Sequence, residues 1–323
     1  MTRILVTGSQ GFVGRHLRAA LDARGIACVG VDRPGTGAEF ERDLSAPDLD
    51  VDDLVARAGA IDHVIYMAAT ITRGSSVDAL ARDNLRAIAD APVRLMEAFA
   101  ARASAPHLVY CSTYKSYGPA RTLPIDPMRP PQDPDPHSYG SAKSLAEALL
   151  AISSRRAGYR YAIVRPTCIY GPGQHLHNAI PLFLKAAWEG RVPTVAGDGQ
   201  NLRDDVYAPD LAWAMIEATL ARAEGAFHAG GERGRTIFET AQVCAEAVAA
   251  LGGPRVTPAV DASKPAKWWL DQSFDLTRTR AQLSYDPLPL LEGLKTEALW
   301  IKAGGIAADA VRFATPRAPR VRG

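Results

Sequence analysis

The sequence lacks long hydrophobic runs, and neither sign of charge dominates. No stretch approaches the ~20 apolar residues of a membrane-spanning helix, and only residues 4–6 are strongly apolar before the first polar turn, too few for a secretory signal. The 37 Lys and Arg residues nearly balance the 35 Asp and Glu residues. This balance gives no electrostatic reason to expect a nucleic acid or an anionic membrane as a partner. We therefore expect a soluble protein of the cytoplasm.

Cysteine is also scarce, and the four cysteines stand far apart at Cys28, Cys111, Cys168 and Cys244. No two of them have a C-x-x-C spacing and no histidine cluster accompanies them, which argues against a zinc site or any other metal centre. Scattered single cysteines are typical of proteins in a reducing compartment.

Short β-branched runs alternate with helical stretches over the first half of the chain. We expect strands at 4–6, 27–31, 63–67, 107–111 and 161–164, and helices that include 80–102 and 139–155. This alternation predicts an α/β fold, a doubly wound parallel-sheet Rossmann domain. Beyond Arg165, glycines and prolines punctuate irregular segments, which predicts a smaller α/β substrate-binding domain.

The expected boundaries follow from this change of texture. Residues 1–166, together with about 205–232, form the larger domain, because 226–229 reads as a strand that returns to its sheet. Residues from about 167–204 and 233–305 form the smaller domain. Residues 306–323, rich in Pro and Arg, form a C-terminal tail.

Three glycines, Gly8, Gly11 and Gly14, stand between the first strand and the first helix. The first permits a tight turn, the second lets backbone amides approach a pyrophosphate, and the third lets the helix pack closely. Asp32 ends the next strand, where its carboxylate can bind the adenosine ribose and repel a 2′-phosphate. This pattern favours NAD over NADP, although Arg33 directly afterwards is a residue that can contact a 2′-phosphate.

A second constellation suits acid–base chemistry. Tyr139 and Lys143 are four residues apart, on one face of a helix. We expect the ammonium of Lys143, with the positive nicotinamide of an oxidised cofactor, to lower the pKa of the Tyr139 phenol. Ser112 and Thr113 follow a strand about 25 residues earlier and could orient a substrate oxygen at the carboxyl edge of the sheet.

Further motifs occur in a fixed order over roughly residues 3–300. They are Thr7-Gly8-Ser9-Gln10-Gly11-Phe12-Val13-Gly14, Asp43-Leu44, Tyr66-Met67-Ala68-Ala69, Ser112-Thr113 with Tyr117-Gly118, Tyr139 with Lys143, Arg165-Pro166, Tyr170-Gly171-Pro172-Gly173, Gly197-Asp198-Gly199, Arg203-Asp204-Asp205-Val206-Tyr207 and Asp210. As a set, these motifs resemble the extended short-chain dehydrogenase/reductase family, the NAD-dependent epimerase/dehydratase group.

The resemblance implies a role for each matching position. Thr113 takes the place of the catalytic Ser or Thr, Tyr139 that of the acid–base residue, and Lys143 holds the nicotinamide ribose. The implied NAD-binding residues are Gly8, Gln10, Gly11, Phe12, Val13, Gly14, Asp32, Arg33, Asp43, Leu44, Met67, Ala68, Ala69, Asn84, Tyr139, Lys143 and Pro166. The implied substrate-binding residues are Thr70, Ser112, Thr113, Lys115, Cys168, His175, Asn178 and Arg203.

Three positions bear on the substrate and the reaction. Arg203 matches an arginine that pairs with a substrate phosphate in sugar-nucleotide enzymes, and the alternative is a salt bridge with Asp204 or Asp205. Cys168 stands where the family often has an Asn that contacts the sugar nucleotide, and a thiol replaces an amide poorly. Tyr114 and the following Lys115 occupy the positions of the Asp-Glu pair of sugar-nucleotide 4,6-dehydratases, which argues against dehydration.

The leading hypothesis is an NAD-dependent epimerase that acts on a nucleotide sugar through transient hydride transfer. The alternative is an NAD-dependent dehydrogenase or reductase of a sugar, polyol or small hydroxy compound without a nucleotide. A third hypothesis, a redox-sensing or structural binding module, conflicts with the intact Thr113, Tyr139 and Lys143. The resemblance also implies a homodimer, in which the helices of 80–102 and 139–155 form a four-helix bundle.

Overall fold

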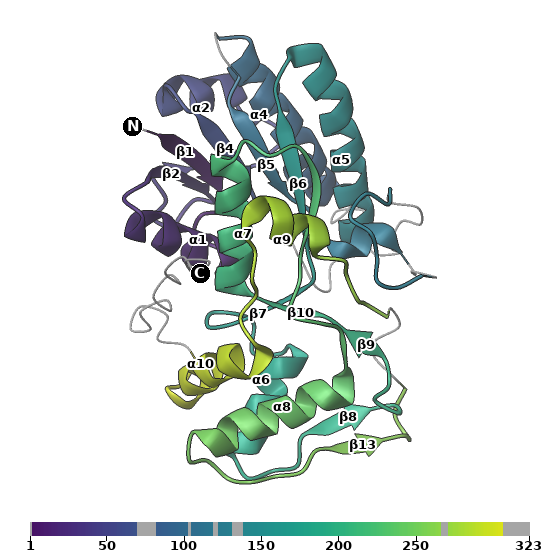
Figure 1. Ribbon diagram of the computed structural model, residues 1–323. Helices are drawn as coiled ribbons and strands as arrows, with labels where there is room; N and C mark the ends of the chain where they lie inside the picture. Colours follow the sequence, from purple (N-terminus) through teal and green to yellow (C-terminus); the bar gives the residue numbers. More distant parts are fainter. Residues whose placement is uncertain are drawn as a thin grey trace.

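A parallel sheet of seven strands lies at the centre of the structure, a computed structural model that describes residues 2–69, 82–102, 105–118, 122–130, 138–265 and 271–305 (Figure 1). The strands follow the order β11-β6-β5-β4-β1-β2-β3, and every neighbouring pair is parallel. They are β1 (Arg3–Thr7), β2 (Ala27–Asp32), β3 (Phe40–Glu41), β4 (His63–Tyr66), β5 (His107–Cys111), β6 (Tyr161–Pro166) and β11 (Gly225–Ala229). The strand order reverses between β1 and β4, where open α/β sheets bind ligands at the carboxyl edge.

Helices cover both faces of this sheet, as the alternation of strands and helices predicted. Alternate side chains of β1 face opposite layers, Ile4 and Val6 one core and Leu5 the other. The first layer contains α1 (Phe12–Ala23), α7 (Ala208–Leu220) and α9 (Thr277–Leu283). The second contains α2 (Val51–Ala58), a π-helical segment η1 (Leu85–Asp90), α4 (Ala91–Ala100) and α5 (Ser138–Ala157). The predicted Rossmann fold, with a strand at 226–229 in its sheet, is confirmed.

The helix expected over 80–102 differs from a regular α-helix in the part that is described. A π-helical segment at 85–90 precedes α4, whose second residue is Pro92. Proline has no N–H to donate to the carbonyl four residues earlier, that of Ile88. Instead, the Ile88 carbonyl accepts a hydrogen bond of 2.8 Å from the buried Tyr110 hydroxyl, and the Ala87 carbonyl accepts one of 2.5 Å from Tyr66.

A smaller α/β unit packs around its own apolar core. Its helices are α6 (Ala179–Trp188), α8 (Ile237–Ala250) and α10 (Leu290–Lys302). Its short strands pair as β7 (Cys168–Tyr170) with β10 (Asp205–Tyr207), β8 (Thr194–Ala196) with β13 (Ala259–Asp261), and β9 (Leu202–Arg203) with β12 (Arg235–Thr236). The domain boundaries given above stay a prediction.

Two absences concern the residues that the structure describes. No helix among them has the length and apolarity to cross a membrane. Within the same ranges, no three His, Cys, Asp or Glu side chains gather in a way that could hold a metal ion.

Candidate active site

The turn between β1 and α1 forms a cradle at the carboxyl edge of the sheet. Gly8 has a φ of +71°, and its amide donates to the Val31 carbonyl over 2.8 Å. A Cβ on Gly14 would lie 2.1 Å from the Gly8 carbonyl oxygen, so only glycine lets α1 pack so closely on the turn. Gly11 caps the start of α1. Free amides at a helix N-terminus fit the pyrophosphate of a dinucleotide such as NAD.

The carboxylate of Asp32 lies against this turn. One oxygen accepts a hydrogen bond of 2.7 Å from the Gln10 amide, and the other accepts one of 2.8 Å from the Arg33 amide. Asp32 thus stands at the end of β2 beside the cradle, where the adenosine ribose is expected. The Arg33 residue is exposed. Phe12 begins α1 directly after the turn.

Other predicted cofactor residues also lie at strand ends. The Thr7 hydroxyl accepts hydrogen bonds of 3.1 Å from the amides of Met67 and Ala68, which ties the segment after β4 to β1. A Cβ on Gly8 would come within 3.2 Å of the Ala68 nitrogen, so the two backbones approach closely. Pro166 ends β6, next to Ala229 of β11. These positions border the same edge of the sheet.

The remaining cofactor positions vary in burial. Asp43 is exposed, and its carboxylate accepts from the amide and hydroxyl of Ser45, whereas Leu44 is buried. Asn84 is buried directly before η1. Val13 and Ala69 are half-buried. Of the predicted substrate residues, Thr70 lies outside the described residues.

The three predicted catalytic residues come from two neighbouring elements. Thr113 follows β5 and caps a short 3-10 helix, η2 (Tyr114–Tyr117), while Tyr139 and Lys143 lie one turn apart on α5. The Lys143 ammonium donates to the Cys111 carbonyl over 2.5 Å and lies 4.5 Å from the centroid of the Tyr110 ring. The end of β5 and the first turns of α5 are therefore in direct contact.

The surroundings of Tyr139 and Lys143 affect the charge that each side chain carries. Burial raises the pKa of its phenol above the ordinary value, and burial lowers the pKa of the Lys143 ammonium to about 8. The Lys143 nitrogen is 5.9 Å from the Tyr139 ring centroid and is committed to the Cys111 carbonyl. Burial disfavours the charged phenolate, and this effect opposes the stabilisation expected from Lys143 and a bound nicotinamide.

Ser112, predicted to contact the substrate, has its hydroxyl directed elsewhere. Its hydroxyl donates to the carboxylate of Glu147, and the residue is only 1% exposed. Thr113, the next residue, lies two positions after the last residue of β5. Its Oγ1 accepts from the Lys115 amide at 3.3 Å.

Two other predicted substrate residues, Cys168 and Arg203, are electrostatic neighbours. The thiol of Cys168 lies 3.6 Å from the Tyr114 hydroxyl and 3.8 Å from the Gln272 side-chain oxygen, and burial raises its pKa to about 11. Arg203 is nearly buried and donates to Asp205 over 2.6 Å, so the predicted salt bridge exists. An inert, neutral thiol beside a paired guanidinium can contact a ligand without reacting with it.

The structure does not bring His175 into this group. His175 is exposed on the segment after β7, while Asn178 precedes α6 and donates to the Gln174 side chain over 3.1 Å. Lys115 lies in η2 and is partly buried. Their roles toward a substrate stay predictions.

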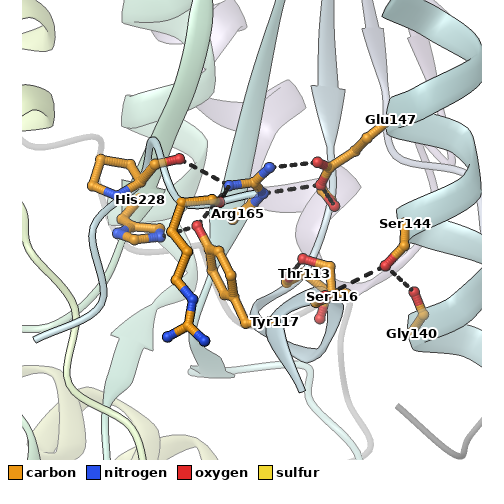
Figure 2. Close-up of polar contacts among 11 residues, drawn as sticks. Thr113, Ser116, Tyr117, Gly140, Ser144, Glu147, Arg165 and His228 are labelled. Atoms are coloured by element: carbon orange, nitrogen blue, oxygen red, sulfur yellow. Dashed lines mark hydrogen bonds and ion pairs between the residues drawn. The ribbon is translucent and has the colours of Figure 1, made fainter. Parts of the chain in front are cut away.

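Glu147 and His228 were missed by the sequence analysis, and Tyr117 and Arg165, which it named only within motifs, received no role. Figure 2 shows them as one buried chain of polar contacts: Arg165 binds Glu147 with two nitrogens and donates to the Tyr117 hydroxyl, which contacts His228. One signal was available, because Glu147 is four residues after Lys143 and therefore on the same face of α5. Its partner Arg165 lies on strand β6, and helical spacing does not reveal that contact.

A scan against protein-family models matches residues 4–230 to the NAD dependent epimerase/dehydratase family. Among curated relatives, a dTDP-4-dehydro-6-deoxy-D-allose reductase of a Streptomyces species is 25% identical, over 93% of this chain and 96% of its own. A UDP-glucose 4-epimerase of Mycolicibacterium smegmatis is 29% identical, over 90% of this chain and 96% of its own. Among solved structures, MoeE5 in complex with UDP-glucose and NAD is 27% identical with a TM-score of 0.74, covering 94% of this chain and 99% of that one.

Proposed function

Because this chain belongs to the NAD dependent epimerase/dehydratase family, we propose that it is an epimerase that acts on a nucleotide sugar. The protein is an enzyme, and NAD is its cofactor. The main support for the proposal is that Thr113 follows β5 at the carboxyl edge of the sheet, where the glycine turn follows β1, and that the helix with Tyr139 and Lys143 contacts this end of β5. Relatives along nearly the whole chain that are named for nucleotide-sugar substrates support it further.

In this proposal, Tyr139, Lys143 and Thr113 each have a separate role in the reaction. Bound NAD supplies a group that accepts a hydride and can return it. The Tyr139 phenolate accepts the proton of a substrate hydroxyl, and the protonated phenol gives a proton back to a carbonyl oxygen. Lys143 holds a positive charge near the site, and Thr113 orients the substrate oxygen by a hydrogen bond. Burial raises the pKa of the Tyr139 phenol, which favours the protonated form that serves the proton-donating direction.

A net oxidoreductase is the second candidate. It uses the same three residues, and the reductase relative along 93% of this chain favours it. Cys168 also favours it, since a thiol at this position is a poor replacement for an amide that contacts a nucleotide sugar. Dehydration fits less well, because Tyr114 and Lys115 carry no carboxylate.

The stoichiometry of the cofactor separates the two candidates. We would incubate the enzyme with a panel of nucleotide sugars and free sugars in the presence of external NAD. An epimerase interconverts isomers with no net NADH, whereas a dehydrogenase accumulates NADH in proportion to product. Steady NADH formation without isomer exchange would contradict the epimerase.

Substitution of the phenol tests the chemistry itself. Tyr139→Phe removes the proton carrier while keeping the ring, so turnover should fall by about 10²-fold or more. NAD affinity, measured by fluorescence titration, should stay within a few-fold. Full activity of this variant would refute the role assigned to Tyr139.

We also propose that the enzyme is a homodimer. Leu145 and Ile152, seven residues apart on α5, are 44% and 57% exposed, and Leu85 on the neighbouring η1 is 41% exposed. Because α5 and η1 are in contact, these exposed apolar side chains favour burial against a second copy. Sedimentation should give twice the mass of one chain, and Ile152→Glu should yield monomers. A monomeric native protein would contradict the dimer.

A further inference from the structure

A buried ion pair joins β6 to α5, one helical turn after Lys143 (Figure 2). Arg165 of β6 donates from Nε and Nη2 to the two carboxylate oxygens of Glu147, at 3.0 and 2.5 Å. Its Nη1 donates to the Tyr117 hydroxyl at 2.6 Å and to the Pro127 carbonyl at 2.9 Å. The side chains of both members of the pair are less than 10% exposed. These hydrogen bonds fix the position and orientation of the Arg165 guanidinium.

The polar chain continues away from the site in one direction. Because Arg165 donates to the Tyr117 oxygen, the Tyr117 hydroxyl is free to donate to Nε2 of His228, 2.6 Å away. His228 is then a neutral ring that donates from Nδ1 to the Asp275 carbonyl at 3.1 Å, in accord with a pKa lowered by burial to about 3. The ion pair is thus anchored on β11 and on the loop before α9.

Toward the site, α5 holds the end of β5 at two successive residues. Lys143 binds the carbonyl of Cys111, and Glu147, one helical turn later, accepts from the hydroxyl of Ser112. The residue that follows is Thr113. Tyr139 lies one turn before Lys143 on the same face of α5. Two turns of one helix therefore fix two consecutive residues of the strand end.

We propose that Glu147 is a positioning residue, which, with Lys143, clamps Cys111 and Ser112 to α5 and so sets the place of the Thr113 hydroxyl relative to the Tyr139 phenol. This inference rests on the proposed function, in which both hydroxyls face one substrate oxygen. The Arg165 ion pair holds the carboxylate so that the Ser112 hydroxyl meets an immobile acceptor. A displacement of about 1 Å between reacting groups lowers turnover by up to ~10²-fold.

The chain offers a matched control for the serine–glutamate contact. On the last turns of α5, the buried Ser153 donates to Glu97 at 2.9 Å, and Glu97 also pairs with Arg156. Ser153→Ala removes the same kind of hydrogen bond from the same helix, far from the end of β5. Ser112→Ala should lower kcat about tenfold or more with KM and NAD affinity nearly unchanged, whereas Ser153→Ala should leave kcat within twofold. Equal kcat for the two variants would overturn the proposal.

A second variant separates the clamp from the ion pair. In Glu147→Gln the amide oxygen still accepts from Ser112 and from Nε of Arg165, while the amide nitrogen faces Nη2, a donor against a donor. We expect this variant to lose more thermal stability than Ser112→Ala but to keep more of its kcat. The opposite order of kcat would mean that turnover depends on the ion pair and not on the hydrogen bond from Ser112, and the clamp would be rejected.

Crystal structures of the two alanine variants test the clamp without any substrate. In Ser112→Ala the Thr113 hydroxyl should move relative to the Tyr139 oxygen by more than about 0.5 Å, the tolerance of a catalytic constellation. In Ser153→Ala it should not move. An unmoved Thr113 in Ser112→Ala overturns the clamp even if the enzyme epimerises sugars, while a moved Thr113 upholds it even if the substrate proves to be different.

Discussion

Two buried glutamates, Glu147 in α5 and Glu297 in α10, stand in opposite electrostatic settings. Glu147 faces the guanidinium of Arg165 and forms a salt bridge. Glu297 is 0% exposed, accepts from the neutral amide of Gln174, and forms no salt bridge with any residue that the structure describes. Burial raises the pKa of Glu297 to about 8. Because burial disfavours a carboxylate, a buried carboxyl group either binds a cation or takes up a proton.

The two settings also serve different parts of the molecule. The Glu147 pair connects the sheet to the helix that carries Tyr139 and Lys143. The contact of Glu297 with Gln174 joins α10 to the segment after β7, inside the smaller unit. A charged contact therefore lies behind the acid–base residues, and a neutral one stabilises the neighbouring segment.

The largest effect on stability is expected when the guanidinium of Arg165 is removed. Arg165→Leu leaves Glu147 buried without its partner, which should lower the free energy of unfolding by about 3–5 kcal/mol. Urea denaturation measures the loss, and the matched change Glu297→Gln, which removes no partner of a charge, should be far milder. A loss below ~1 kcal/mol in Arg165→Leu would show that Glu147 does not depend on the guanidinium.

Glu297 should make the free energy of unfolding depend on pH. Its folded pKa of about 8 exceeds the ordinary value of 4.5, so between these pH values the native state holds a proton that the unfolded state has lost. Stability from this group is complete below pH 4.5 and is lost as the pH rises through 8, by up to ~1.4 kcal/mol per pH unit. Unfolding curves from pH 5 to 9 should show this slope in the native protein, and Glu297→Gln should flatten it. An unchanged slope in the variant would assign the effect to another group.

Buried histidines should act in the opposite direction at acid pH. Burial lowers the pKa of His16 and His107 to about 4, so both rings are neutral in the folded protein. Between pH 6.5 and 4 the unfolded state binds more protons, and stability should therefore fall as the pH falls. His16→Gln should weaken this acid slope when thermal midpoints are compared at pH 7 and 5. Equal slopes would exclude His16 as a contributor.

The smallest effect is expected at an exposed pair of the same residue types. Arg160 and Glu224 form a salt bridge with side chains that are 59% and 54% exposed. Glu224→Ala should change the free energy of unfolding by less than about 1 kcal/mol, and the change should shrink further in 1 M salt. A larger, salt-resistant loss would mean that burial is not what separates Arg165 from Arg160.

Much of the fold could be read from local patterns. The predicted strands, the helix over 139–155 and the glycine turn agree with β1, β2, β4, β5, β6, α5 and the Gly8 turn. The exception in a described region, the π-helical segment before Pro92, depends on hydroxyls from Tyr66 and Tyr110 that reach it from two strands. A helical pattern contains no information about such distant donors.

Residue types and helical spacing predict only part of the geometry at the candidate site. Ser112 looked equivalent to Thr113 in the sequence, but its hydroxyl points at Glu147. Arg203 had two possible partners for a salt bridge, and the structure pairs it with Asp205. The acidity expected of Tyr139 with a bound nicotinamide stays a prediction, and burial, which raises the pKa of the phenol, is a contribution that the spacing alone does not reveal.

The sequence by itself determined the order of strands and helices, the glycine turn and the shared helix face of Tyr139, Lys143 and Glu147, since each depends on periods of two or about four residues. Only the tertiary structure decided which charges are paired and which are neutralised. Arg165 meets Glu147, and Lys143 meets the Cys111 carbonyl, because the sheet order sets β5 and β6 side by side beneath α5. Burial follows from that packing, and burial sets the cost of every charge that lacks a partner.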